Sequence, residues 1–203
     1  MLHAVRLGAV VELGVVAERH RLDSNVVLTQ LRDAESAGWV VEHRGPLSGW
    51  SLTSTGRQEV DRLLAAEIDE LGGRAEIEVE YARFLRLNAP FLDVCTDWQI
   101  RVDEHGVPQP NRHTDAAHDA QVLARLEPLH EGVTSIGESL ARILGRFGGY
   151  VPRFTHAWTR LAANDVDWLT RPLIDSYHTV WFELHEDLLA TLGRTRSEER
   201  GGS

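Results

Sequence analysis

The sequence predicts a mainly α-helical protein: a small N-terminal domain with helices and one β-hairpin, then a larger helical domain. Apolar residues recur every three or four positions along most of the 203 residues, and only residues 39–52 read as strand, turn and strand. Charge divides the chain as well. Residues 1–60 hold six Arg against seven Asp and Glu, for −1, whereas residues 61–203 hold fifteen against twenty-four, for −9. The expected domains are residues 1–71 and 74–196, with a polar tail at 197–203.

The first twenty residues predict two short helices, "LHAVRLGAVV" and "ELGVVAERH". A turn at "RLDS" offers Asp23 or Ser24 as the N-cap of a third helix. One face of that helix is apolar and the opposite face is polar. The polar face carries Asn25, Thr29, Arg32 and Ser36. Gly38 occupies the position where a glycine commonly ends a helix.

The hairpin and the helix that follows it complete the N-terminal domain. Val40 and Val41 begin a strand, "GPLSG" makes the turn, and "WSL" forms the return strand. Thr53 is placed to cap a helix over residues 54–71, where Val60, Leu63, Leu64 and Ile68 form the apolar stripe. Three helices, a hairpin and a long exit helix are the parts of a winged helix-turn-helix.

The segments "LRDAESAGWVVEHRG" and "GWSLTSTGRQEV" resemble the signature of MarR-type and related bacterial winged-helix regulators. The resemblance covers roughly residues 1–70 and implies a winged helix with DNA as its partner. Asn25 and Thr29, near the start of the third helix, are then candidates for contacts with base edges or phosphate. Arg32 is placed to reach a guanine or a phosphate, Arg44 to probe the minor groove or the DNA backbone, and Arg21 to touch the DNA backbone.

Acidic residues near the same surface leave a second interpretation open. Asp33, Glu35 and Glu42 lie close to the candidate arginines, and Arg32 and Glu35 have the spacing of a solvated helical ion pair. A single copy offers few cations, so DNA binding is expected to need a homodimer. Otherwise, the winged helix contacts protein or serves as a scaffold.

The acidic part predicts helices separated by short breaks. "GGR" at residues 72–74 ends the exit helix, and a long amphipathic helix with Pro90 follows. "DEHGVPQPNRHTDAAHD" predicts a loop, and its His105, His113 and His118 have no metal-ligand spacing. Further helices are expected over residues 115–129, 131–147, 151–164 and 173–192. Cys95, the only cysteine, is expected to be a buried thiol.

The last of these helices places two histidines, His178 and His185, in the middle of its apolar arc. A buried imidazole needs a hydrogen-bond partner, because leaving it unsatisfied costs roughly 1–3 kcal/mol. They are therefore either structural histidines or part of an aromatic pocket for a small-molecule effector. The candidate ligand-binding residues are Trp98, Asp175, His178, Trp181 and His185. The nearby acids Glu183, Glu186 and Asp187 are expected to form a solvated face.

A second resemblance concerns the acidic part. "FLRLNAPFLDVCTDWQ" and "DSYHTVWFELHEDLLATLG" resemble helical segments that follow a winged helix in actinobacterial regulators, or in the tails of pyruvate-phosphate-dikinase-like, phosphoenolpyruvate-utilising proteins. The phosphohistidine loop and ATP-binding segment of those enzymes are not in the sequence. The resemblance therefore implies an architecture and not an activity.

No common catalytic motif occurs in the sequence: there is no P-loop, GxSxG, GxGxxG after a strand, or HExxH. We therefore expect no enzyme activity, no cofactor and no metal, and a cytoplasmic protein without membrane spans. The first hypothesis is a homodimeric DNA-binding transcriptional regulator, controlled by an effector bound in its helical domain. The alternative is an accessory module that contacts protein and is related to phosphoenolpyruvate-utilising enzymes.

Overall fold

A computed structural model describes residues 1–8, 10–20, 22–45 and 48–196, and it is mainly helical, as the sequence predicts. These residues form two compact units. One contains Met1–Gly72 together with residues 186–196, and the other contains Gly73–His185. The C-terminal residues thus group with the first unit, and not with the acidic helices that precede them. In the described part of the chain, no helix combines the length and hydropathy needed to cross a membrane.

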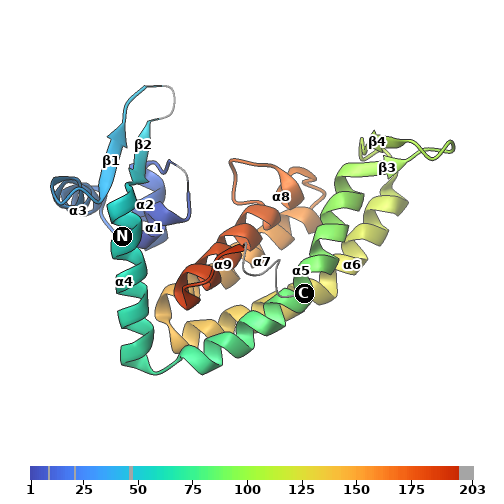
Figure 1. Ribbon diagram of the computed structural model, residues 1–203. Coiled ribbons are helices and arrows are strands. Elements are labelled where there is room, and N and C mark those ends of the chain that lie inside the picture. The colour runs from blue at the N-terminus through green and yellow to red at the C-terminus, as the bar shows by residue number, and fades with distance from the viewer. Residues whose placement is uncertain (9, 21, 46–47, 197–203) are drawn as a thin grey trace. The chain divides into compact units, whose positions relative to one another are not determined.

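The first unit contains short helices, a hairpin and a longer helix (Figure 1). They are α1 (Leu2–Arg6), α2 (Leu13–His20), α3 (Ser24–Ser36), β1 (Val40–His43), β2 (Gly49–Leu52) and α4 (Ser54–Leu71). The strands pair antiparallel, with Val40 opposite Leu52 and His43 opposite Gly49. An isolated bridge between Val11 and Trp50 joins the segment before α2 to the hairpin.

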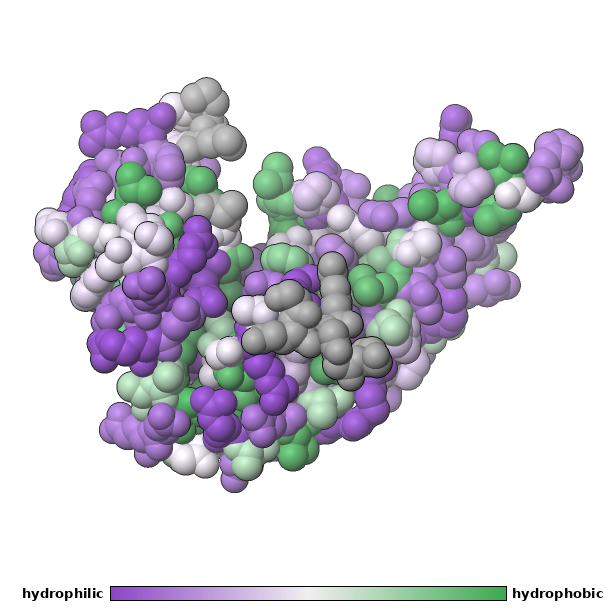
Figure 2. All heavy atoms as spheres, viewed as in Figure 1, coloured by the Kyte–Doolittle hydropathy of each residue, from purple (hydrophilic) through white to green (hydrophobic). Residues whose placement is uncertain are grey.

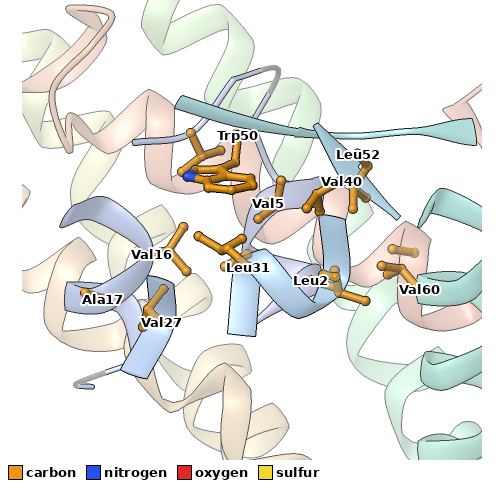
Figure 3. Packing of buried hydrophobic residues seen from close by; sticks show 14 of the residues in the cluster. Leu2, Val5, Val16, Ala17, Val27, Leu31, Val40, Trp50, Leu52 and Val60 are labelled. Atoms are coloured by element: carbon orange, nitrogen blue, oxygen red, sulfur yellow. The ribbon is translucent and has the colours of Figure 1, made fainter. Parts of the chain in front are cut away.

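The core of this unit lies between α1, α2, α3 and the hairpin (Figure 3). Val27, Leu31 and Ala34 line the buried face of α3, which confirms the predicted apolar face. The sequence prediction for α4 was wrong at one position: Val60, Leu64 and Ile68 are buried, but Leu63 is exposed. A stripe at four-residue spacing is enough to cover this core, so Leu63 turns outward.

Local signals in the sequence set the ends of these helices as expected. The Asp23 side chain accepts a hydrogen bond from the Asn25 amide, 2.8 Å away, at the start of α3. Gly38 and Gly72, which follow α3 and α4, have φ angles of +75° and +64°. Glycine adopts this left-handed conformation without the steric cost that a Cβ brings.

Thr53 and Gly56 fasten the start of α4 to the end of α3. Thr53 Oγ1 donates to the Gly38 carbonyl, 2.7 Å away, and accepts from the Gly56 amide at 2.9 Å. A Cβ on Gly56 would lie 1.8 Å from the carbonyl oxygen of Trp39. The Thr-x-x-Gly sequence is therefore required by close backbone packing in this unit.

We expect Gly56→Ala to lower the free energy of unfolding by between about 1 and 3 kcal/mol, the usual cost of overpacking. Gly14→Ala is the matched control, because a Cβ there meets nothing within 4 Å and alanine favours a helix. Urea denaturation followed by circular dichroism measures both. Equal stability of the two variants would contradict the role assigned to Gly56.

The second unit is built on two long helices that pack side by side, α5 and α6 (Figure 1). Its elements are α5 (Arg74–Gln99), β3 (Ile100–Val102), β4 (Pro108–Pro110), α6 (Ala116–Ile143), the 3-10 helix η1 (Gly145–Gly149), α7 (Tyr150–Ala162), α8 (Asp167–Thr170) and α9 (Tyr177–Leu192), whose end belongs to the first unit. The expected break near residue 130 is wrong, because α6 continues through Pro128.

The loop expected at residues 103–119 was also wrong in part, because β3 and β4 form a hairpin there. Ile100 lies opposite Pro110, Arg101 opposite Gln109 and Val102 opposite Pro108. Ile100, Val102 and Val107 are exposed, and hydrophobic residues are visible at this hairpin in Figure 2. Two prolines in a three-residue stretch argue against a strand from sequence alone, which is why this strand was missed.

Candidate functional site

The candidate DNA-binding arginines of the first unit, Arg32 and Arg44, meet at one carboxylate. Arg32 Nη1 donates to Glu42 Oε2 at 3.1 Å, and Arg44 Nη2 donates to the same oxygen at 2.8 Å. Arg32 also pairs with Glu35 at 2.8 Å, as the i,i+3 spacing indicated. Hydrogen bonds from Arg44 and then from Arg32 lower the pKa of Glu42, so this carboxylate is ionised at neutral pH.

Packing on the hairpin fixes the position of Arg32. Its guanidinium carbon lies 4.9 Å from the ring centroid of Trp50, a residue buried in the core of the unit. A guanidinium over an indole face is held by cation–π attraction. The α3 helix and the β1 strand also contact each other directly (Figure 1). Arg32 and Arg44, from different elements, therefore share one small patch of surface.

The other candidate DNA-contacting residues that the structure describes, Asn25 and Thr29, are uncharged. Asn25 and Thr29 are exposed on α3, and Thr29 Oγ1 donates to the Asn25 carbonyl at 2.9 Å. Their side chains thus lie one turn apart at the beginning of the helix. Arg21 lies outside the described residues. Four of the five candidates are therefore located, all on α3 or at the end of β1.

The candidate ligand-binding residues of the second unit lie partly in an aromatic cluster between α5 and α9. The rings of Phe91 and Trp181 stack with centroids 4.1 Å apart, and Phe84 lies 4.9 Å from Trp181. Trp181 Nε1 donates to Asn88 Oδ1 at 3.0 Å. Asn88, two residues before Pro90 on α5, thus holds the indole in place.

The two histidines of α9 border the same cluster. The His178 ring lies 6.1 Å from the Phe91 ring, nearly parallel to it. His185 is buried, 5.2 Å from Phe84 and 6.3 Å from Tyr81. Both imidazoles therefore pack against aromatic rings of α5.

Asp175 belongs to a cluster of charges centred on Arg153 of α7. Arg153 donates from Nε and Nη2 to the two Asp175 oxygens, each at 2.7 Å, and Nη2 lies 2.7 Å from Glu183 Oε2. Burial acts to lower the pKa of Arg153, but the two carboxylates outweigh it and raise the pKa. The guanidinium therefore stays charged and joins α7 to the start of α9.

The expectation of a solvated acidic face on α9 was wrong for two of its three residues. Glu183 and Asp187 are buried, 5% and 2% exposed, and only Glu186 is partly exposed. Glu183 meets Arg153, and Asp187 Oδ1 lies 2.9 Å from His3 Nε2. A carboxylate leaves water when a partner compensates for its desolvation, and these partners are far away in sequence.

Trp98 has partners that differ from those of Trp181. Its Nε1 donates to the Val166 carbonyl at 3.1 Å, and its ring lies 4.6 Å from the ring of His113. The Trp98 indole thus faces the segments before α6 and α8. The five candidate ligand-binding residues are distributed over an aromatic cluster, an ion cluster and this separate contact.

Sequence reasoning missed a third aromatic group around His130 of α6. His130 Nδ1 and the Tyr177 hydroxyl oxygen are 3.2 Å apart, and the Trp158 ring stacks on His130 at 5.1 Å. Burial lowers the pKa of His130, although Glu131 opposes this. A lone histidine on a helix gave no signal of these partners, which come from α7 and α9.

Among the residues that the structure describes, no three His, Cys, Asp or Glu side chains gather to hold a metal ion. Burial raises the pKa of the Cys95 thiol to about 12, so at neutral pH this cysteine lacks the thiolate of a nucleophile. Comparisons with protein-family models, with curated proteins and with solved structures found no match to the chain. The assignment of a function therefore depends on the geometry of the two units.

We expect Arg153→Gln to lower the free energy of unfolding by about 3 kcal/mol or more, because the change removes the cation facing a buried carboxylate. Arg160→Gln is the matched control: it removes the same charge from α7, but its pair with Asp165 is far more exposed. The control change should lower the free energy of unfolding by less than about 1 kcal/mol. Chemical denaturation measures both, and similar losses would show that Arg153 is not a structural cation.

We also expect His130 to make stability depend on pH. The folded protein disfavours the imidazolium, so the unfolded chain binds more protons, and stability falls as the pH drops below the ordinary value of 6.5. His130→Asn keeps an acceptor for Tyr177 and cannot titrate. Denaturation between pH 8 and pH 5 should show a smaller pH dependence for the variant, whereas identical slopes would refute this assignment.

Proposed function

We propose that the N-terminal unit binds DNA and that the protein is a transcriptional regulator. The observation that supports this most is the convergence of Arg32 and Arg44 on Glu42. One guanidinium comes from a helix and the other from the end of a hairpin strand. Two guanidinium groups around one anionic oxygen make a site that a DNA phosphate can occupy in place of the carboxylate.

The carboxylates do not prevent this exchange. The Arg44 side chain is 82% exposed and that of Arg32 is 44% exposed. Exposed ion pairs contribute little to stability, and salt screens them. Glu42 therefore holds the two arginines in position, and little free energy is needed to separate them from it.

The order of elements supports the same proposal. Three helices, the β1–β2 hairpin and the long α4 follow one another as in a winged helix-turn-helix. In that arrangement α3 enters the major groove, and Asn25 and Thr29 contact base edges or phosphates. Each copy offers few unscreened cations, so a homodimer that grips two half-sites is part of the proposal. The helical unit then supplies the dimer surface or responds to an effector.

The mixed charge of this surface favours a second candidate, a protein-docking role. Glu35 and Glu42 together offset the charges of Arg32 and Arg44. A surface with alternating charges suits a protein partner better than a polyanion, because its acids repel phosphates. Glu42 separates the two candidates, since it opposes DNA binding and would assist the docking of a basic protein surface.

For DNA binding, we expect the double change Arg32→Ala and Arg44→Ala to weaken retention of the gene's upstream DNA. The slope of log affinity against log salt concentration should become less steep by about two, one for each lost phosphate contact. Fluorescence anisotropy over a salt series measures this slope. Arg86→Ala with Arg142→Ala, on the other unit, changes net charge equally and should leave the slope unchanged.

Glu42→Gln tests the proposal from the opposite direction. It removes the competing carboxylate, so it should strengthen DNA binding several-fold at low salt. If the wild-type protein does not bind this DNA even at low salt, the regulator proposal is rejected. If Glu42→Gln leaves DNA binding unchanged while the double arginine variant abolishes it, the exchange at Glu42 is rejected.

A further inference from the structure

The β3–β4 hairpin and the segment that leads from it to α6 enclose an open hollow of about 560 Å³. Its charged lining residues are Arg101, Asp103, Glu104 and Arg112. Arg101, Asp103 and Gln109 share one face of the hairpin, since side chains alternate along strands and Arg101 lies opposite Gln109. By the same alternation Ile100 and Val102, both exposed, belong to the other face, and Val102 also contributes to the lining of the hollow.

Arg112 and Thr114 line this hollow from a segment held by hydrogen bonds of Asn111 and His113. Asn111 Nδ2 donates to the Trp98 carbonyl at 3.0 Å and to Asp119 Oδ1 at 3.1 Å. His113 Nδ1 lies 3.1 Å from Asp119 Oδ2, and the His113 amide donates to Asn111 Oδ1. His113 has a φ of +54°, an unfavourable conformation for a residue with a Cβ. Residues in such conformations concentrate at functional sites.

Charge is separated along the hollow. Asp103 and Glu104 lie toward the turn of the hairpin, where Asp103 Oδ1 accepts from the amides of His105 and Val107. Arg101 and Arg112 lie toward α6. Arg101 is already paired with Asp115 at 3.1 Å, whereas Arg112 makes no ion pair with the described residues. The hollow therefore has one cationic end and one anionic end.

We infer that this hollow binds a small linear zwitterion, with its carboxylate on Arg112 and Arg101 and its ammonium near Glu104 and Asp103. Arg101 and Asp103 are two residues apart, about 7 Å along an extended strand, and this sets the separation of the two ligand charges. A simple anion would meet the repulsion of the two acids, and a simple cation that of the arginines. This inference does not rest on the proposed DNA binding.

The test uses 6-aminohexanoate as the probe, with hexanoate and hexylammonium as analogues that each lack one charge. Two-dimensional amide NMR of the full chain reports binding through the signals of residues 101–114. We expect 6-aminohexanoate to bind at least about tenfold more tightly than either analogue, since each end adds a charge-assisted hydrogen bond. Arg112→Gln should weaken its binding by at least about tenfold, and Arg86→Gln, an equal charge change on α5, should not.

Glu104→Gln tests the anionic end, and it should weaken binding of 6-aminohexanoate but strengthen binding of hexanoate. Three results would overturn the inference: no saturable binding of 6-aminohexanoate, equal affinity for hexanoate, or equal losses in Arg112→Gln and Arg86→Gln. If the Arg112→Gln spectrum shows unfolding, Arg112→Lys replaces it. This variant keeps the charge but loses the forked guanidinium, so it should bind more weakly than the wild type, and unchanged binding would count against the assignment.

Discussion

The last helix places charged groups inside the protein, and much of the structure is arranged around them. Glu183 and Asp187, one turn apart on α9, are both buried, and each meets a basic side chain: Arg153 for Glu183, and His3 for Asp187. An unpartnered buried carboxylate would cost several kcal/mol, so these contacts constrain the fold far more than exposed pairs do. The boundary between the two units falls within α9, between His185 and Glu186. The helix therefore has one buried carboxylate paired with a basic side chain in each unit.

The sequence predicted the features that depend on near neighbours along the chain. Asp23, Gly38, Thr53 and Gly72 mark helix ends, and each does so through local backbone geometry. The spacing of apolar residues likewise located the buried face of α3. These signals operate over a few residues, so a single sequence contains them in full.

What the sequence could not supply was the partner of each polar side chain. Asn88 and Trp181 are 93 positions apart, and Arg153 and Glu183 are 30 positions apart, so no spacing rule relates them. Proline is disfavoured inside helices and strands, yet α6 continues through Pro128 and β4 contains Pro108 and Pro110. In such places tertiary packing outweighs local propensity.

Arginine supplies every basic side chain except histidine in this chain, and its neighbours determine what each one can do. Where the carboxylate partner is buried, as for Arg153, the guanidinium is structural. Where the pair is exposed, as at Glu42, the same group remains exchangeable with an outside anion. Arg112 is a third case, because it has no ion-pair partner among the described residues. A count of charges cannot distinguish these three situations.

The prolines of β4 have a consequence for the behaviour of the protein in a crowded solution. The Asp103 backbone N–H donates to the Val107 carbonyl, and the Asn111 backbone N–H donates to the Gln99 carbonyl. The residues whose backbone groups face β3 therefore alternate along the chain with Pro108 and Pro110. The two β4 residues whose backbone groups point away from β3 are therefore Pro108 and Pro110, and a proline has no backbone N–H to donate. A foreign strand approaching that edge finds carbonyl oxygens without the donors that it needs, so β4 is a poor template for adding another strand.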